Sequence, residues 1–342
     1  MKKLRNSLAI FTGVLIFVLS VISAFSAQDP PCVYLSVLGD SIASGYGLKD
    51  LESSYAAEVS KEKHYSLSND AVDGHTTTDL LWVVCHDSVA REGLEKADLV
   101  AISIGGNDIL QLLLNSNTTA LLDILSNGAQ SQYVKNAVSV ATEKLLFSCM
   151  EIRSLNPDVP IILQTQYNPL YAHEQYKQFA SFADKLAPAF ADILNYVSEE
   201  LGNIYIADVY TTFDNYYKET GDYSVIQADG IHPSETGHDL IAQVILPIID
   251  KLESEGIVPI AYETYYLLGD PDASGTVTIS DATMIQKYIA RIVIFKDRVV
   301  RMCADADEDG LVTIKDATAI QKYLAKLTTD SSIDTYIPYI TE

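Results

Sequence analysis

Between about residues 33 and 252, short apolar runs alternate with longer segments in which apolar residues recur at helical spacing. This alternation is typical of a parallel sheet covered by helices on both faces. In such sheets the functional residues lie at the carboxyl ends of the strands. The predicted strands are Val33–Leu38, His64–Leu67, Leu99–Ile104, Pro160–Gln164 and Ile204–Ala207, and the predicted helices include Thr77–Arg91, Tyr133–Ser154, His173–Leu201 and Ser234–Leu252.

The pattern changes after residue 252. Residues 253–264 show little periodicity and are predicted to form a linker, which separates a first domain (28–252) from a second (265–342). In the second, Val277–Arg291 reads VTISDATMIQKYIAR and Val312–Lys326 reads VTIKDATAIQKYLAK, with eleven of the fifteen positions identical. A repeat of this fidelity indicates a duplicated supersecondary unit.

The amino-terminal segment has the three parts of a secretory signal peptide. Lys2, Lys3 and Arg5 are basic, an apolar run extends from Leu8 to Ile22, and small residues follow up to Ala27. The alternative is a membrane anchor, but the run is short for a span. We therefore expect residues 1–27 to be removed, and the mature protein to be extracellular and free of the membrane.

Charge and cysteine content narrow the possible partners. Lys and Arg number 23 against 46 Asp and Glu, a net charge of -23. This balance excludes nucleic acid as an expected partner, because binding phosphate needs a basic face. Cys32, Cys85, Cys149 and Cys303 match no zinc pattern. Disulfides persist outside the cell, and we predict a Cys85–Cys149 bond between two helices of one domain, with free buried thiols as the alternative.

Five residues near predicted strand ends have the chemistry of nucleophilic catalysis. Ser41, in the triplet GDS, follows the first strand and opens a helix, where its own N–H faces a developing oxyanion. Gly74 follows the second strand and allows close backbone approach to a ligand. Asn107, in GGND after the third strand, has an amide that donates hydrogen bonds. Asp229 and His232 precede the last helix, three residues apart, so both fit in one turn. Each residue alone is explained equally well as a helix cap or a turn residue.

Together, these blocks resemble those of the SGNH hydrolases, also called GDSL esterases, over roughly residues 33–252. The resemblance implies a three-layer α/β/α fold with a flavodoxin-like parallel sheet. It implies that Ser41 is the nucleophile, His232 the general base and Asp229 the third member of the triad. The Ser41 N–H, the Gly74 N–H and the Asn107 amide would form the oxyanion hole, and catalysis would need no cofactor.

Two twelve-residue segments, one in each repeat, have the pattern of calcium-binding EF-hand loops. Oxygen-bearing side chains occupy positions 1, 3, 5 and 12, glycine occupies position 6, and position 7 offers its carbonyl oxygen. A helix is predicted after each loop, but no clear helix before either. The predicted ligands are Asp270, Asp272, Ser274, Thr276 and Asp281 in the first loop, and Asp305, Asp307, Asp309, Leu311 and Asp316 in the second.

A loop and trailing helix, duplicated over about residues 268–326, resembles a type I-like dockerin module. The resemblance implies a small all-α domain with two structural Ca²⁺ ions and, as partner, a cohesin domain on the scaffoldin of a cellulosome-like complex. A calcium-stabilised module without a partner is the alternative. Aromatic residues and a proline at the two ends of the module are predicted to pack together as a clasp. These residues are Tyr265, Tyr266, Tyr336, Pro338 and Tyr339.

The two halves together imply a secreted esterase of the plant cell wall, removing acetyl or feruloyl groups from polysaccharide. One alternative is a lipolytic or lysophospholipase-type esterase, because Leu110–Leu125 is rich in leucine and follows the GGND block. In that case the segment lines an acyl-chain pocket, whereas a core helix is its structural explanation. Another alternative is a catalytically inactive binding module held on a scaffold.

Overall fold

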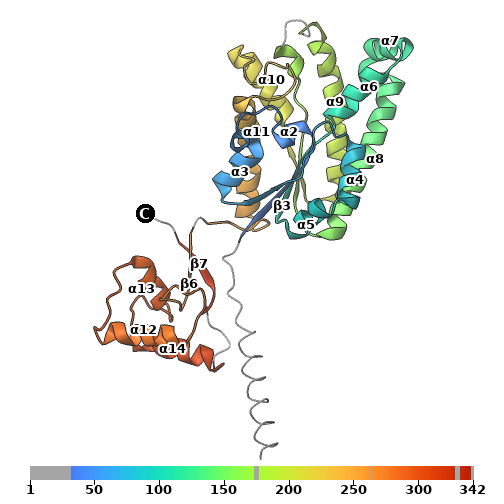
Figure 1. Ribbon diagram of the computed structural model, residues 1–342. Coiled ribbons are helices and arrows are strands. Elements are labelled where there is room, and N and C mark those ends of the chain that lie inside the picture. The colour runs from blue at the N-terminus through green and yellow to red at the C-terminus, as the bar shows by residue number, and fades with distance from the viewer. Residues whose placement is uncertain (1–31, 173–176, 263, 328–331, 340–342) are drawn as a thin grey trace, which may run out of the picture. The chain divides into compact units, whose positions relative to one another are not determined.

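The computed structural model describes residues 32–339, except 173–176, 263 and 328–331. The described residues form two compact units, Cys32–Ala261 and the residues from Tyr262 onward (Figure 1). The predicted signal peptide lies outside the described residues. Within the part of the chain that is described, no helix combines the length and the apolar character needed to cross a bilayer.

The first unit is built on a five-stranded parallel sheet of order β2-β1-β3-β4-β5, the order of flavodoxin-like folds. The five predicted strands are confirmed, with ends shifted by no more than two residues. The central strands β1 and β3 are mostly apolar because helices bury both of their faces. The strands are β1 (Tyr34–Gly39), β2 (Ser66–Asn69), β3 (Leu99–Ser103), β4 (Ile161–Gln164) and β5 (Ile204–Ala207).

Helices cover both faces of the sheet, so the predicted three-layer α/β/α architecture is confirmed (Figure 1). An apolar cluster on one face joins the sheet to α3, α10 and α11, and a second cluster on the other face joins it to α4, α5, α8 and α9. These helices are α3 (Tyr55–Lys63), α4 (Thr77–His86), α5 (Ser88–Lys96), α8 (Gln132–Leu155), α9 (Lys177–Leu201), α10 (Val209–Thr220) and α11 (Glu235–Ser254).

The prediction of a single helix over Thr77–Arg91 was wrong. The chain forms α4 and α5 with a break at Asp87, whose carboxylate accepts hydrogen bonds from the N–H groups of Val89 and Ala90. Asp is a strong N-cap, so it starts a new helix here. In the predicted linker, Val258 is buried in the core of the first unit.

The predicted disulfide between Cys85 and Cys149 was also wrong, because all four cysteines of the chain, which all lie in described segments, are free thiols. Cys149, on α8, is fully buried in the apolar cluster beside α4. Burial raises the pKa of this thiol to about 12. It therefore packs as a small apolar side chain.

A glycine at the end of β1 shapes the approach to the first functional block. Gly39 has a φ of 139°, and a Cβ atom there would lie 2.0 Å from the carbonyl oxygen of Ser103 on β3. Only glycine permits this approach between neighbouring strands. The chain can therefore turn directly from β1 into α2 (Ser41–Ser44) at the carboxyl edge of the sheet.

The second unit contains α12 (Ile279–Ile289), α13 (Arg298–Ala304) and α14 (Ile314–Leu324). Helices α12 and α14 follow the two loops as predicted, each starting with a capping box. The prediction that no helix precedes a loop was wrong for the second loop, which follows α13. This helix has seven residues, too few for its apolar periodicity to be visible in the sequence.

The predicted clasp is confirmed. Strands β6 (Tyr265–Leu267) and β7 (Tyr336–Pro338) pair antiparallel, and the rings of Tyr266 and Tyr339 lie 6.1 Å apart in a T-shaped contact. The Thr264 hydroxyl donates a hydrogen bond of 2.6 Å to the carbonyl of Tyr339. The small helical unit thus gains a two-stranded sheet that the all-α prediction did not include.

Candidate active site

Ser41 is held at the first position of a short helix beyond β1. The Asp40 N–H donates to the Ser103 carbonyl at 3.0 Å, and the Asp40 carboxylate accepts from the Ile42 N–H at 3.0 Å. Asp40 is therefore the N-cap of α2. Within the described residues, the Ser41 N–H donates no hydrogen bond. This N–H at the helix N-terminus is thus free to receive an anionic oxygen.

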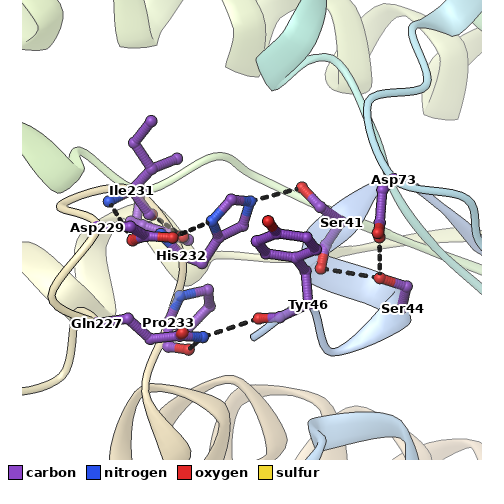
Figure 2. A network of polar contacts seen from close by, with 10 residues as sticks. Ser41, Ser44, Tyr46, Asp73, Gln227, Asp229, Ile231, His232 and Pro233 are labelled. Carbon is purple, nitrogen blue, oxygen red and sulfur yellow. Dashed lines mark hydrogen bonds and ion pairs between the residues drawn. The ribbon is translucent and has the colours of Figure 1, made fainter. Parts of the chain in front are cut away.

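The structure brings Ser41, His232 and Asp229 into one chain of hydrogen bonds (Figure 2). His232 Nε2 lies 2.9 Å from Ser41 Oγ, and His232 Nδ1 lies 2.6 Å from Asp229 Oδ2. An Asp that holds Nδ1–H leaves Nε2 as the acceptor for the serine hydroxyl. The arrangement is therefore able to transfer a proton from Ser41 to His232.

Asp229 is suited to remain ionised in this arrangement. Burial alone would raise the pKa of its carboxyl group. Hydrogen bonds from the Ile231 N–H, the His232 ring and the His232 N–H outweigh burial, so the pKa lies below its ordinary value. A carboxylate that accepts several hydrogen bonds favours its charged form.

Two residues that the sequence analysis did not single out hold the loop between Asp229 and His232. The Gln227 side-chain amide donates hydrogen bonds of 2.8 Å to the carbonyls of Tyr46 and Pro233, and the Gln227 N–H donates to the His232 carbonyl (Figure 2). Tyr167 donates its hydroxyl to the Ile231 carbonyl at 2.6 Å. Gln227 and Tyr167 carry no pattern in the sequence, because their role depends on contacts between distant segments.

The structure also describes the predicted oxyanion donors. Gly74 has a φ of 78°, and its N–H makes no hydrogen bond within the described segments. Asn107 is the second residue of α6 (Gly106–Asn115), and its amide donates to the His75 carbonyl at 2.9 Å. This bond orients the amide and uses one of its two hydrogens, so the other remains for a ligand.

Asp40 is a buried carboxyl group next to the proposed nucleophile, and it is 2% exposed. Burial is the largest cause that raises the pKa of Asp40 to about 7, and the neighbouring charges of Asp108 and Asp73 add to the rise. The hydrogen bond from the Ile42 N–H acts in the opposite direction. The Asp40 carboxyl group therefore titrates near neutral pH.

A recess beside the third block is lined by residues of α8 and α9, including Phe190, and by residues at or just after the ends of β3 and β4, including Gly105 and Gln166. The leucine-rich segment 110–125 forms parts of α6 and of α7 (Thr118–Asn127). Leu112 and Leu113 pack in a small apolar cluster around Ile124, whereas Leu110 and Leu114 are exposed. The segment is therefore partly a core element and partly an exposed apolar face.

The two acidic loops gather carboxylates in the second unit. Carboxylate oxygens of Asp270, Asp272 and Asp281 lie within 4.8 Å of one another. Asp281 Oδ1 is buried and has no hydrogen-bond partner in the described chain. Ser274 Oγ lies 3.1 Å from the Thr276 carbonyl oxygen. An orphaned buried oxygen among hard oxygen donors fits a Ca²⁺ ion.

In the second loop, carboxylate oxygens of Asp305, Asp307 and Asp309 lie within 4.8 Å of one another. The buried Asp316 carboxylate accepts from the Asp307 N–H at 3.1 Å, which brings position 12 next to position 3. The Leu311 N–H donates to Asp309, and the Leu311 side chain is exposed, so only its backbone is suited to face an ion. These oxygen donors also fit Ca²⁺.

Comparison with known proteins finds a family match in each of the two units. Residues 37–240 match the GDSL-like Lipase/Acylhydrolase family, and residues 268–325 match the Dockerin type I domain. An uncharacterized protein of Bacillus subtilis (strain 168), YpmR, is 25% identical over 226 residues, which cover 64% of this chain and 82% of that protein.

Two solved structures share the fold of the first unit. The lipase Lip_vut3 from a goat rumen metagenome is 22% identical with a TM-score of 0.50, covering 67% of this chain and 100% of that chain. An extracellular lipase from Streptomyces rimosus is 19% identical with a TM-score of 0.50, covering 64% of this chain and 99% of that chain.

Proposed function

Because this chain belongs to the GDSL-like lipase/acylhydrolase family and ends in a dockerin type I domain, we propose that it is a secreted serine esterase of the plant cell wall. It removes acetyl or feruloyl groups from polysaccharide while attached to an extracellular, cellulosome-type complex. The observation that carries the catalytic part is the hydrogen-bonded chain from Ser41 through His232 to Asp229. The dockerin supports the extracellular part, together with the secretory pattern of residues 1–27.

In the proposed reaction, Ser41 Oγ attacks the ester carbonyl carbon while His232 Nε2 takes its proton. The Ser41 N–H, the Gly74 N–H and the Asn107 amide hold the oxyanion, and each such donor contributes about 2.7–4 kcal/mol to the transition state. When the tetrahedral intermediate collapses, the alcohol leaves with the proton from His232. Water, activated by the same histidine, then releases the acid from the acyl-enzyme. Asp229 orients and stabilises the imidazolium in both steps.

The second unit is proposed to bind two Ca²⁺ ions and a cohesin domain. The ligands are the carboxylates and carbonyls of the two loops, and the ions would hold each loop against the start of its helix. Positions 10 and 11 read Ile279-Ser280 in one repeat and Ile314-Lys315 in the other. Ile279 and Ile314 are 59% and 57% exposed, so either repeat offers an apolar anchor. The charge of Lys315 makes the two docking modes unequal.

Hydrolysis of a panel of esters tests the proposed function. Acetylated xylan, feruloylated arabinoxylan and long-chain p-nitrophenyl esters are compared, with Ser41→Ala as the inactive control. We expect turnover of acetyl or feruloyl esters to exceed turnover of long acyl chains. The exposed Leu110 and Leu114 beside the third block favour the lipolytic alternative, which a preference for long chains would support. Absence of turnover on every ester would support the inactive binding module.

A further inference from the structure

An exposed aromatic ring lies beside the proposed general base (Figure 2). The rings of Tyr46 and His232 are 4.6 Å apart between centroids, at an interplanar angle of 44°. Tyr46 is 48% exposed, so its ring is accessible to a ligand beside His232. The proposed roles of Ser41, His232, Asp229 and the oxyanion donors make no use of this ring.

The backbone of Tyr46 is held from both sides. Its N–H donates to the Ser41 carbonyl at 3.0 Å, and its carbonyl accepts from the Gln227 side chain at 2.8 Å. The next residue, Gly47, has a φ of 78°, and a Cβ atom there would lie 2.3 Å from Gln227 Oε1. A side chain at position 47 would therefore push Gln227 away from Tyr46, and the positive φ also favours glycine. The ring is thus attached to a backbone that is fixed relative to both Ser41 and His232, so a ligand that contacts it meets a preorganised surface.

The proton transfers of the proposed reaction determine which part of the substrate lies next to the His232 imidazole. The alcohol must accept its proton from Nε2 as it leaves, so the alcohol part of the ester lies next to the imidazole during acylation. The Tyr46 side chain is half exposed beside the same imidazole. A pyranose ring has faces covered with C–H groups, which complement the negative face of an aromatic ring.

We propose that the Tyr46 ring is the binding platform for the alcohol part of the substrate, a pyranose unit of an acylated polysaccharide. This inference rests on the proposed function and names the subsite that gives it selectivity for a sugar alcohol. The acyl-enzyme no longer contains the alcohol. The Tyr46 ring should therefore affect the rate of acylation and not the rate of deacylation, whereas His232 takes part in both steps.

The test compares wild type, Tyr46→Ala and Tyr46→Phe on acetylated xylo-oligosaccharides and on ethyl acetate, whose alcohol has no ring. The first readout is the ratio of kcat/KM for the sugar ester to kcat/KM for ethyl acetate. The second is the deacylation rate constant from pre-steady-state kinetics. Tyr196→Ala is a matched control, because Tyr196 is also about half exposed but lies near the carboxyl end of α9, away from the strand ends that carry the site.

We expect Tyr46→Ala to lower the ratio about two- to tenfold, the range of aromatic ring contacts, without slowing deacylation. Tyr46→Phe keeps the ring and should retain most of the ratio. A loss that is equal on both esters, or that includes deacylation, would show that Tyr46 positions His232 and would overturn the platform. If the ratio is unchanged in Tyr46→Ala and wild type is active on the sugar ester, the proposed role of Tyr46 is wrong and the proposed function stands. A wild type inactive on the sugar ester overturns the proposed function as well.

Discussion

Replacing Asp40 by Asn tests the consequence of burying a carboxyl group next to the proposed nucleophile. Burial raises the pKa of Asp40 from 3.8 to about 7 in the folded chain. Between these two pH values the folded state binds more protons than the unfolded state, so this group lowers the stability of the fold as pH rises. The stability that protonated Asp40 retains at pH 4 is lost progressively until the pH exceeds 7.

The size of the effect follows from the two pKa values. One pKa unit corresponds to 1.36 kcal/mol, so ionising Asp40 in the folded chain costs on the order of 4 kcal/mol in total. About 2–3 kcal/mol of this cost falls between pH 5 and pH 8. Asn cannot ionise, has nearly the same shape and still accepts the hydrogen bond from the Ile42 N–H that caps α2. The variant should therefore fold like wild type and lose less stability at high pH.

The assay is urea unfolding at pH 5, 6, 7 and 8 in the presence of calcium. Trp82, the one tryptophan of the sequence, belongs to the first unit, so its fluorescence reports this unit. Between pH 5 and pH 8, Asp40→Asn should lose about 2–3 kcal/mol less free energy of unfolding than wild type. Asp50→Asn is the matched control, because the exposed Asp50 caps its helix with the same 3.0 Å bond. Parallel pH profiles of Asp40→Asn and wild type would refute the reasoning.

Three other predictions follow from the geometry. Asn107→Ala should lower kcat about 10²–10³-fold with a smaller change in KM, and a change in KM alone would make it a substrate-positioning residue. Gln227→Met removes two side-chain hydrogen bonds, so the free energy of unfolding should fall by about 1–3 kcal/mol. Gln227→Met should slow acylation and deacylation alike, and equal rates in variant and wild type would contradict a role of Gln227 in positioning His232. The second loop, with four acidic ligands against three, should bind Ca²⁺ more tightly. Calorimetry should show the larger loss of affinity in Asp307→Ala than in Asp272→Ala, and equal losses would refute the asymmetry.

Features that depend only on neighbouring residues could be predicted from the sequence. The five strands, the parallel sheet between helices and the positions of the two acidic loops follow from periodicity and from the spacing of Gly and Asp, whereas the flavodoxin-like architecture was implied by the resemblance to SGNH hydrolases. The position of Ser41 after β1, and of His232 before α11, was also readable, because strand ends and helix caps have local signatures. The break between α4 and α5 at Asp87 also has a local signature, the N-cap Asp. It was missed because the apolar periodicity continues across it.

Features that join distant segments of the chain depend on the tertiary structure and could not be predicted. Ser41 and His232 are 191 positions apart, and their 2.9 Å contact exists because parallel strands bring their carboxyl ends to one edge. The hydrogen bond between Gln227 and Tyr46 has no local signature, since either residue fits an ordinary turn. The same reason explains the free Cys149 and the raised pKa of Asp40. Whether a thiol lies within bonding distance of another thiol, or a carboxyl group is shielded from water, depends on which distant segments pack around it.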